Sequence, residues 1–398
     1  MEDMIVAHIN GKMLTWARTR AGLEIGRLAK DKTTVEKLRA WESGEEFPSQ
    51  SQAIALAEKL GISYAMLFMP TVPPPDIPEI PDLRTLDGQR LKNPSLDFRE
   101  VLNDTIFRQE WLRDERTDEG LDPLPFVGSF SVKDDPKVIA ADMRDVLQVT
   151  PESRSRCHDY EAFIKHIVAN AEDAGVLMMR SAIVRHATNR PLSVAEFRGF
   201  ALIDVIAPLV FVNDSDAKAA QIFTIAHELA HIWIGADGVS DRKPNQENES
   251  KNAIELFCDK VAAELLAPEE EIRTQWRGSP TIETTRRVAA HFRVSTLVAL
   301  RRAKDLGLIP FNTFVAQVES EYARFKESDQ KKRDKQKKAE KHGGNFWASF
   351  ELRNGKSFNA TVAASLRNRR VTFTEAAALM GINVASTVRY LSRVEASQ

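Results

Sequence analysis

Residues 222–233 read Ile-Phe-Thr-Ile-Ala-His-Glu-Leu-Ala-His-Ile-Trp, and this stretch decides the fold around it. Apolar residues recur here at helical spacing, so we expect a largely buried helix over residues 217–234. His227 and His231 are four positions apart. Because about four residues make one helical turn, both imidazoles project from the same side of the helix. Two imidazoles in this arrangement can bind one zinc ion.

A tetrahedral catalytic zinc site needs a third protein ligand and keeps its fourth position open for water. The best candidate is Glu255, because residues 252–266 are predicted to form a second helix that carries Glu255 and Asp259 one turn apart. Glu255 would complete the ligand set in a zincin-like, gluzincin-type arrangement. Asp259 would accept the second N–H of a ligand histidine, which fixes the tautomer of that histidine.

Glu228 supplies the expected chemistry. It lies about 100° round the helix from His227, beside the metal, where it can take the proton of a zinc-bound water. The predicted reaction is therefore hydrolysis of a peptide bond, with Glu228 as general base and then general acid. A group that stabilises the oxyanion is also expected. No tyrosine lies between Tyr160 and Tyr322, and the remaining candidates are Arg185, His186 and Arg198.

Two alternatives concern the ligands themselves. Manganese or iron can also occupy a set of two imidazoles and one carboxylate, although that set suits zinc. Cys258 lies between Glu255 and Asp259 in the sequence, but it points away from their helical face. We interpret Cys258 as a small buried apolar residue, with a thiolate ligand as the alternative.

Composition limits the class of protein. The chain has 398 residues, enough for two or more domains, and 55 Lys+Arg against 57 Asp+Glu give a net charge of -2. That balance predicts neither a polyanion-coated partner nor a membrane surface for the whole molecule. The two cysteines have no CxxC spacing, and neither an export signal nor a membrane-spanning segment is recognisable. We therefore expect a cytoplasmic protein.

The order of elements around the motif is helix, strands, helix. A helix is expected over residues 160–174, followed by strands over 176–179, 200–203 and 209–212. Near the carboxyl end, residues 346–352 read as a strand followed by a turn at Asn354-Gly355 and by helices. The fold class is therefore α+β and mostly helical, with a small α/β segment at the carboxyl end.

Composition shifts divide the chain. Residues 70–81 are rich in proline, which favours an extended linker, and residues 331–338 are a charge-dense run typical of a solvated helix or a disordered connector. The expected segments are an amino-terminal domain of short helices (1–70), a Pro-rich linker (71–96), a helical connector (97–149), a core that carries the metal motif (150–275), a helical extension (276–325), a charged connector (326–343) and a small carboxyl-terminal domain (344–398).

Several blocks of sequence resemble the ImmA/IrrE family of metallopeptidases, in that family's order. The blocks are Phe197-Arg-Gly-Phe-Ala-Leu-Ile-Asp, Pro208-Leu-Val-Phe-Val-Asn, Phe223-Thr-Ile-Ala-His-Glu-Leu-Ala-His and Glu255-Leu-Phe-Cys-Asp-Lys-Val-Ala-Ala-Glu-Leu-Leu-Ala-Pro268. The resemblance covers residues 150–310, and more weakly residues 346–398. The family usually has Ala-Asn where this chain has Cys258-Asp259, a departure that touches packing rather than the ligands.

The resemblance carries implications for site and function. His227, His231 and Glu255 would take the family's zinc-ligand positions, and Glu228 its catalytic position. The implied protein is an intracellular regulatory protease, which in several members cleaves a partner repressor or antitoxin after a stress or mobile-element signal. The identity of the substrate does not transfer.

Residues 9–69 resemble the XRE, lambda-repressor-like helix-turn-helix family. The similarity lies in Trp41-Glu-Ser-Gly44, Pro48 and Ala53-Ile-Ala-Leu-Ala-Glu-Lys-Leu-Gly-Ile-Ser63. Such folds place the amino end of a recognition helix in the major groove, which here would offer Thr33, Thr34 and Lys37. Residues 1–70 carry nine Lys+Arg and nine Asp+Glu, however, and phosphate neutralisation supplies much of the affinity for DNA. Recognition of operator DNA and recognition of a protein, including the substrate, therefore both remain open.

Three functional hypotheses follow from the sequence. The first is a zinc endopeptidase that acts on a repressor or antitoxin and uses its helix-turn-helix domain for DNA or partner recognition. The second is an XRE-type transcription factor whose peptidase-like domain is a sensor. The third is a toxin–antitoxin component that works by association.

Overall fold

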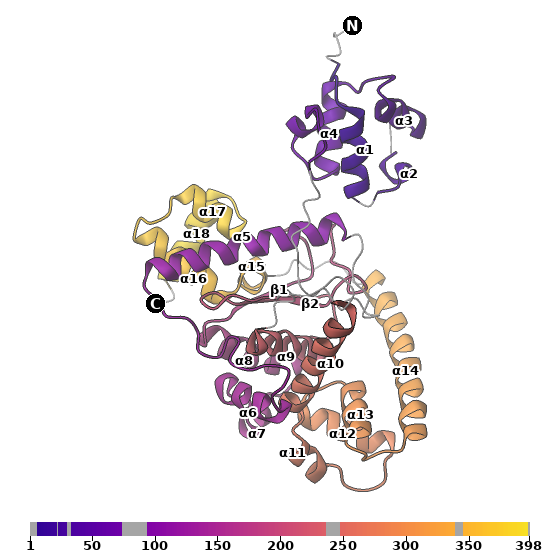
Figure 1. Ribbon diagram of the computed structural model, residues 1–398, viewed down its shortest axis with the longest axis vertical. Helices are drawn as coiled ribbons and strands as arrows, with labels where there is room; N and C mark the ends of the chain where they lie inside the picture. Colours follow the sequence, from indigo (N-terminus) through magenta and orange to yellow (C-terminus); the bar gives the residue numbers. More distant parts are fainter. Residues whose placement is uncertain are drawn as a thin grey trace. The chain divides into compact units, whose positions relative to one another are not determined.

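The computed structural model (Figure 1) describes residues 6–21, 23–29, 33–73, 94–235, 247–338 and 345–396. The chain divides into two compact units, one formed by Met1–Ile80 with Arg90–Asp104 and the other by Pro81–Gln89 with Thr105–Gln398. Most of the predicted linker, residues 71–96, lies outside the described residues, as does the end of the predicted charged connector.

The first unit is a set of short helices around one apolar core. The helices are α1 (Gly11–Arg20), α2 (Ile25–Leu28), α3 (Val35–Ser43), α4 (Gln50–Lys59), the 3-10 helix η1 (Tyr64–Phe68) and the start of α5 (Leu96–Asp118). Leu14, Leu38 and Trp41 are buried at its centre. Arg18 of α1 pairs with Glu42 of α3 through its Nε and Oε1 atoms at 2.6 Å, which ties these two helices together.

The second unit is built on a three-stranded sheet. Its strands β1 (Leu177–Ser181), β2 (Gly199–Leu202) and β3 (Leu209–Asn213) lie in the order β1-β3-β2. β1 runs parallel to β3, and β2 runs antiparallel to it with Gly199 opposite Val212. β2 is therefore an edge strand of the described sheet.

Helices cover both faces of this sheet. The helices of the second unit that precede the motif are α6 (Pro136–Leu147), α7 (Pro151–Arg156) and α8 (Tyr160–Asp173), and the next two are α9 (Lys218–Ile234) and α10 (Glu247–Leu266). Helices α8 and α9 lie on one side of the sheet, and α5 lies on the other (Figure 1). Every residue of β1 and β3 is buried, as expected for strands that are covered on both faces.

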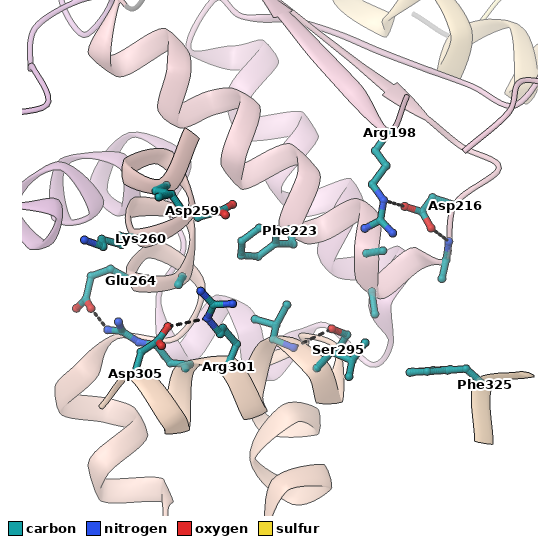
Figure 2. Close-up of a pocket in the computed structure, with 18 of the residues that line it drawn as sticks. Arg198, Asp216, Phe223, Asp259, Lys260, Glu264, Ser295, Arg301, Asp305 and Phe325 are labelled. Carbon is teal, nitrogen blue, oxygen red and sulfur yellow. Dashed lines mark hydrogen bonds and ion pairs between the residues drawn. The ribbon is translucent and has the colours of Figure 1, made fainter. Parts of the chain in front are cut away.

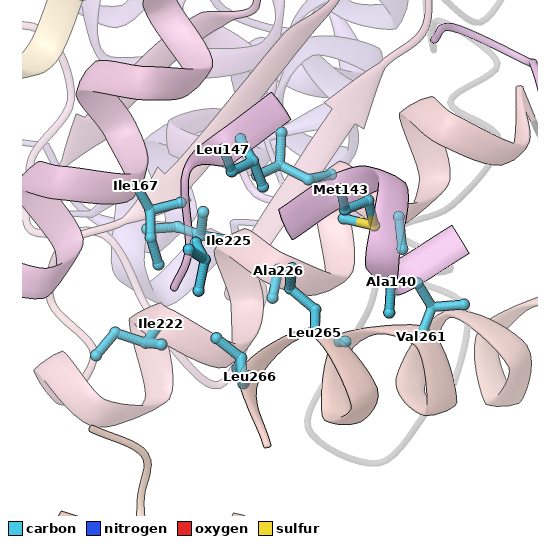
Figure 3. Close-up of a cluster of buried hydrophobic side chains, with 14 of the residues drawn as sticks. Ala140, Met143, Leu147, Ile167, Ile222, Ile225, Ala226, Val261, Leu265 and Leu266 are labelled. Carbon is cyan, nitrogen blue, oxygen red and sulfur yellow. The ribbon is translucent and has the colours of Figure 1, made fainter. Parts of the chain in front are cut away.

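The main core lies between α6, α8, α9 and α10. Met143 of α6, Ile225 and Ala226 of α9, and Leu265 of α10 meet there (Figure 3). The indole N–H of Trp233 on α9 donates to Asp142 Oδ1 at 2.6 Å. This packing holds α9 and α10 side by side, which is the condition for the predicted metal site.

The remaining helices follow α10 in the chain. They are α11 (Glu269–Gln275), α12 (Ile282–Phe292), α13 (Thr296–Asp305), α14 (Phe311–Lys338), α15 (Phe346–Asn354), α16 (Lys356–Arg367), α17 (Phe373–Met380) and α18 (Val384–Glu395). α14 is one continuous helix through the expected boundary at residue 325. The run of basic residues at 331–338 is helical to Lys338.

The fold class is α+β and mostly helical, as predicted, and the expected strands and site helices form close to their predicted bounds. The strand predicted at residues 346–352 is wrong, because the elements described within residues 345–396 are all helical. The prediction of a small α/β segment at the carboxyl end is therefore wrong as well. Asn345 caps α15 by accepting from the backbone N–H groups of Trp347 and Ala348. Aromatic residues favour strands on average, but here Phe350 is buried on one helical face, and that packing overrides the preference.

None of the helices in the described part of the chain is long and apolar enough to cross a membrane.

Candidate metal centre

The helix α9 places its functional side chains inside the protein. Residues 221, 222 and 224–234 are all buried, because α8, α10 and the strands β2 and β3 surround the helix. His227, Glu228 and His231 are 2%, 5% and 4% exposed. Polar groups at this depth need partners, since burying them without hydrogen bonds is costly.

The structure brings together the three predicted ligands. The Nε2 atoms of His227 and His231 are 3.1 Å apart. Glu255 of α10 extends its two oxygens to them, with Oε2 at 3.2 Å from His227 Nε2 and Oε1 at 3.0 Å from His231 Nε2. These residues form a group of donor atoms that all lie within 4.8 Å of one another.

The spacing and chemistry of these donors fit a divalent metal ion. Around a tetrahedral zinc, bonds of about 2.05 Å place neighbouring donor atoms about 3.3 Å apart, close to the separations found here. The Nε2 atom of a neutral imidazole, when its Nδ1 carries the proton, is an acceptor, so it cannot bond to another acceptor without a cation or an added proton between them. One divalent ion satisfies His227, His231 and Glu255 together.

Asp259 supports the orientation of His227. Its Oδ1 atom lies 3.1 Å from His227 Nδ1, on the side of the ring that faces away from His231. When Nδ1 carries the proton and donates to this carboxylate, the lone pair of Nε2 points to the shared centre. Asp259 is one turn after Glu255 on α10, so one helix positions both carboxylates.

The surroundings of Glu255 favour the ionised form that a metal ligand needs. Burial raises the pKa of its carboxyl group, but the hydrogen bonds and charges of His227 and His231 outweigh burial. The net effect holds the pKa of Glu255 well below its ordinary value. The site therefore combines one carboxylate with two imidazoles.

Glu228 follows His227 on α9 and packs against the edge strand β2. A Cβ atom at Gly199 would lie 3.4 Å from Glu228 Cγ and only 2.6 Å from Thr224 Cγ2. Only glycine permits so close an approach of β2 to α9 without displacement. Sequence reasoning did not identify Gly199, although a glycine directly before a predicted strand, here residues 200–203, is a signal of close backbone approach.

A cleft of about 1610 Å³ opens beside Asp259 (Figure 2). Phe223 of α9 and Leu256 of α10 supply apolar surface, and Tyr322 and Phe325 of α14 line its far side. The charges along the cleft that Figure 2 draws include the ion pairs Arg198–Asp216 at 3.5 Å and Arg301–Asp305 at 3.3 Å. Asp259 lines the cleft and contacts His227 directly, so the cleft lies next to the metal centre. Its volume leaves room for a segment of polypeptide.

The remaining candidates are placed elsewhere or in other roles. His186 contacts Arg353 at 2.9 Å, stacks on Phe350 and lies against Phe346 at a tilt, so it packs against the carboxyl-terminal helix α15. Arg185 adopts a left-handed backbone conformation, with a φ of +47°. Cys258 is fully buried in the apolar core, which agrees with the interpretation as a small core residue.

The residues proposed for DNA contact lie at the start of α3. Thr34 caps this helix, its side chain accepting from the backbone N–H of Lys37. Thr34 and Lys37 are exposed, and Thr33 is half-buried. Their placement is compatible with either DNA or a protein as the partner.

Comparison with known families places the metal centre in a recognised domain. Residues 172–304 match the family model described as the IrrE N-terminal-like domain, a peptidase family. A search of curated proteins found no match. The matched segment runs from the end of α8 to α13 and contains both site helices, so this part of the chain is similar to the IrrE N-terminal-like domain of that peptidase family.

Proposed function

We propose that the protein is a zinc-dependent endopeptidase that acts on a protein regulator, either a repressor or an antitoxin, in a stress or mobile-element response. The observation that carries this proposal is the convergence of His227, His231 and Glu255, with the buried Glu228 next to His227 on the same helix. The match of residues 172–304 to a peptidase family supports the same chemistry.

The residues have distinct roles in this mechanism. His227, His231 and Glu255 would hold zinc, which when bound supplies a Lewis acid that activates water and polarises the scissile carbonyl group. Glu228 accepts the proton of the attacking water and delivers it to the leaving amine nitrogen. Asp259 keeps His227 in one tautomer and orientation.

The edge strand β2 supports a peptide substrate. The N–H of Asn213 donates to the carbonyl oxygen of Arg198 at 2.8 Å, which fixes the hydrogen-bonding pattern between β3 and β2. In an antiparallel pair this pattern alternates, so the backbone groups of Gly199 and Ala201 face away from β3. An extended substrate can add to this edge beside Glu228, with neighbouring side chains in the cleft.

The amino-terminal unit would provide recognition. It resembles XRE-type helix-turn-helix domains, and Thr33, Thr34 and Lys37 would contact DNA if its partner is an operator. The helix α3 also carries Glu36 and Glu42, which balance the charges of Lys37 and Arg39. Its partner is therefore operator DNA or a protein, with the protein substrate included.

A Glu228→Gln variant tests the proposed chemistry. The zinc-loaded protein is incubated with a peptide library derived from a whole proteome, and new chain ends are read by mass spectrometry. We expect Glu228→Gln to keep its zinc but to lose cleavage by about 10²- to 10⁴-fold, because the variant cannot accept a proton. Glu110→Gln, at an exposed position of α5, is the matched control and should cut like the parent protein.

Two outcomes would contradict the proposal. Equal cleavage by the parent protein and Glu228→Gln would mean that another group, or another protein in the sample, performs the reaction. A parent protein that binds zinc and cuts no peptide, together with unchanged cellular function of Glu228→Gln, would favour the sensor hypothesis.

A further inference from the structure

The last two helices are joined by a short, well-capped turn. α17 ends at Met380, and α18 begins at Val384, so three residues connect them. Gly381 ends α17 in the left-handed conformation with a φ of +69°, and the side chain of Asn383 caps α18. Two helices joined by a three- or four-residue turn with glycine form the helix-turn-helix unit that places its second helix in DNA.

The inner faces of the pair are packed. Ala376 and Met380 of α17 and Thr387 and Tyr390 of α18 are buried. The ring of Tyr390 lies 5.0 Å from that of Phe350 on α15, in an edge-to-face contact. This packing fixes which face of α18 points outward.

The position of the turn is also fixed by side chains from other helices. Asn354 of α15, which is buried, donates through Nδ2 to the carbonyl oxygen of Met380 at 2.9 Å. Arg108 of α5 donates through Nε to the carbonyl oxygen of Leu379, also at 2.9 Å. The last carbonyl groups of α17 are therefore held by the body of the second unit, which presents α18 rigidly.

The outer face of α18 carries side chains that suit a DNA groove. Val384 and Val388 are 42% and 46% exposed, and Arg389 and Arg393 are also exposed. Val384 and Val388 are one helical turn apart, and so are Arg389 and Arg393, so the two valines and the two arginines form neighbouring stripes along the exposed half of α18. Arginine can bond to guanine in a bidentate manner, and small apolar side chains contact the methyl group of thymine.

The charge of this region favours a nucleic acid over a protein surface. Residues 345–396 contain seven Lys+Arg and three Asp+Glu, a net charge of +4, whereas the whole chain has -2. On α18 the acidic residue is Glu395, in the last turn, after both arginines. Arg369, in the turn between α16 and α17, is exposed as well. Duplex DNA attracts such a basic surface through its phosphates.

We propose that α17 and α18 form a DNA-binding unit, in which the outer face of α18, carried by Val384, Val388, Arg389 and Arg393, enters the major groove of duplex DNA. This site is separate from the metal centre and from the amino-terminal unit. The proposal does not depend on peptidase activity. It makes the carboxyl-terminal helices a DNA-recognition element of the chain.

The test uses the full-length protein and fluorescence anisotropy. The probes are a mixed-sequence duplex of about 30 base pairs and the sequences enriched from a random duplex pool, each titrated from low to moderate salt. We expect the double variant Arg389→Ala/Arg393→Ala to bind at least about tenfold more weakly at low salt and to show a shallower dependence of affinity on salt. Zinc content and thermal melting should stay unchanged, because both side chains point outward.

Three variants make the result specific. Arg156→Ala/Arg277→Ala removes the same charge from exposed positions outside the carboxyl-terminal helices and should bind DNA like the parent protein. Lys37→Ala/Arg39→Ala removes the same charge from α3 and should leave the α18 contribution intact. Arg389→Lys keeps the charge but loses the bidentate fork, so it should retain affinity for the mixed duplex and lose preference for the enriched sequences.

Each contrary outcome would overturn the proposal. If the parent protein binds neither probe at low salt, α18 does not bind DNA, and its outer face would then serve another partner, such as a protein. Equal losses in Arg389→Ala/Arg393→Ala and Arg156→Ala/Arg277→Ala would show a dependence on total charge alone. A loss confined to Lys37→Ala/Arg39→Ala would assign DNA binding to the amino-terminal unit.

Discussion

The metal centre and the pair α17–α18 are both built from two packed helices, but they turn their functional side chains in opposite directions. His227, Glu228 and His231 face inward and are almost inaccessible, whereas Val388 and Arg389 face solvent. Bond-breaking chemistry gains from a buried site, where charges act strongly on one another. Recognition of a macromolecule needs side chains that can reach its surface.

This difference predicts different costs of mutation. In the metal centre each polar group is the partner of another, as His227 is for Glu255 and Asp259, so a change in one affects zinc binding and stability together. On the outer face of α18, a side chain can be removed with little effect on folding. Variants of the two regions should therefore separate into two classes.

The largest effect is expected for Glu255→Ala, which removes the carboxylate from the proposed ligand set. Saturating zinc should stabilise the parent protein by about 4 kcal/mol when its concentration is a thousand times the dissociation constant, and this should raise its melting temperature by several degrees. In Glu255→Ala both the zinc-dependent rise and cleavage should disappear. Differential scanning fluorimetry with zinc or with a chelator measures the rise, and Glu110→Ala serves as the exposed control.

DNA binding should be unaffected by Glu255→Ala if the two regions are independent. A variant that kept the full zinc-dependent rise would show that Glu255 does not bind the metal. In that case the close approach of its oxygens to His227 and His231 would have a purely structural meaning.

A smaller effect is expected for Asp259, which acts on the metal centre through its contact with His227. Loss of the carboxylate that orients a metal-bound histidine typically weakens metal binding by about 10- to 100-fold. Asp259→Ala should approach the upper end of that range. Asp259→Asn, which can still accept the Nδ1–H through its carbonyl oxygen, should lie near the lower end. Competition with a zinc-sensitive dye measures both, and unchanged affinity in Asp259→Ala would exclude the orienting role.

Much of the metal centre could be predicted from sequence, because it depends on local rules. The spacing of His227 and His231 places both on one face of α9, and the same spacing relates Glu255 to Asp259 on α10. Gly199 could be recognised from sequence as a place where another part of the backbone comes close, but local rules could not identify Thr224 of α9 as its neighbour, because the two meet through the tertiary packing of a strand on a helix.

At the carboxyl end the local signals conflicted with one another, and the wrong one was given more weight. Aromatic residues at 346–352 favoured a strand, although Asn345 is a good helix cap. The turn between α17 and α18 also had recognisable signals, since Thr372 and Glu375 form a capping box and Gly381 ends the first helix. The geometry of a helix-turn-helix was readable here, but the arrangement of α18 against Phe350 needed the structure.

The smallest effect concerns the contact that joins these carboxyl-terminal helices to the sheet layer. Glu172 of α8 accepts hydrogen bonds from the backbone N–H of Ser357 at 3.3 Å and from its hydroxyl group at 3.1 Å, at the start of α16. Burial raises the pKa of the Glu172 carboxyl group above its ordinary value, and the bonds from Ser357 and Lys356 offset burial only in part. The folded protein therefore holds the proton of Glu172 more tightly than the unfolded chain does.

A raised pKa of an acid has a definite sign in the pH dependence of stability. The contribution of Glu172 is fully present below its ordinary pKa of 4.5 and is lost as the pH rises through the higher pKa of the folded state. Glu172→Gln stays neutral and can still accept from Ser357, so relative to the parent its free energy of unfolding should increase as the pH rises from about 4 to 7. Urea unfolding at a series of pH values measures this difference, with Glu110→Gln as control. If the parent protein instead gained stability relative to Glu172→Gln over that pH range, the raised pKa of Glu172 would be contradicted. DNA binding by Glu172→Gln that is unchanged at neutral pH would show that the position of α18 does not depend on this charge.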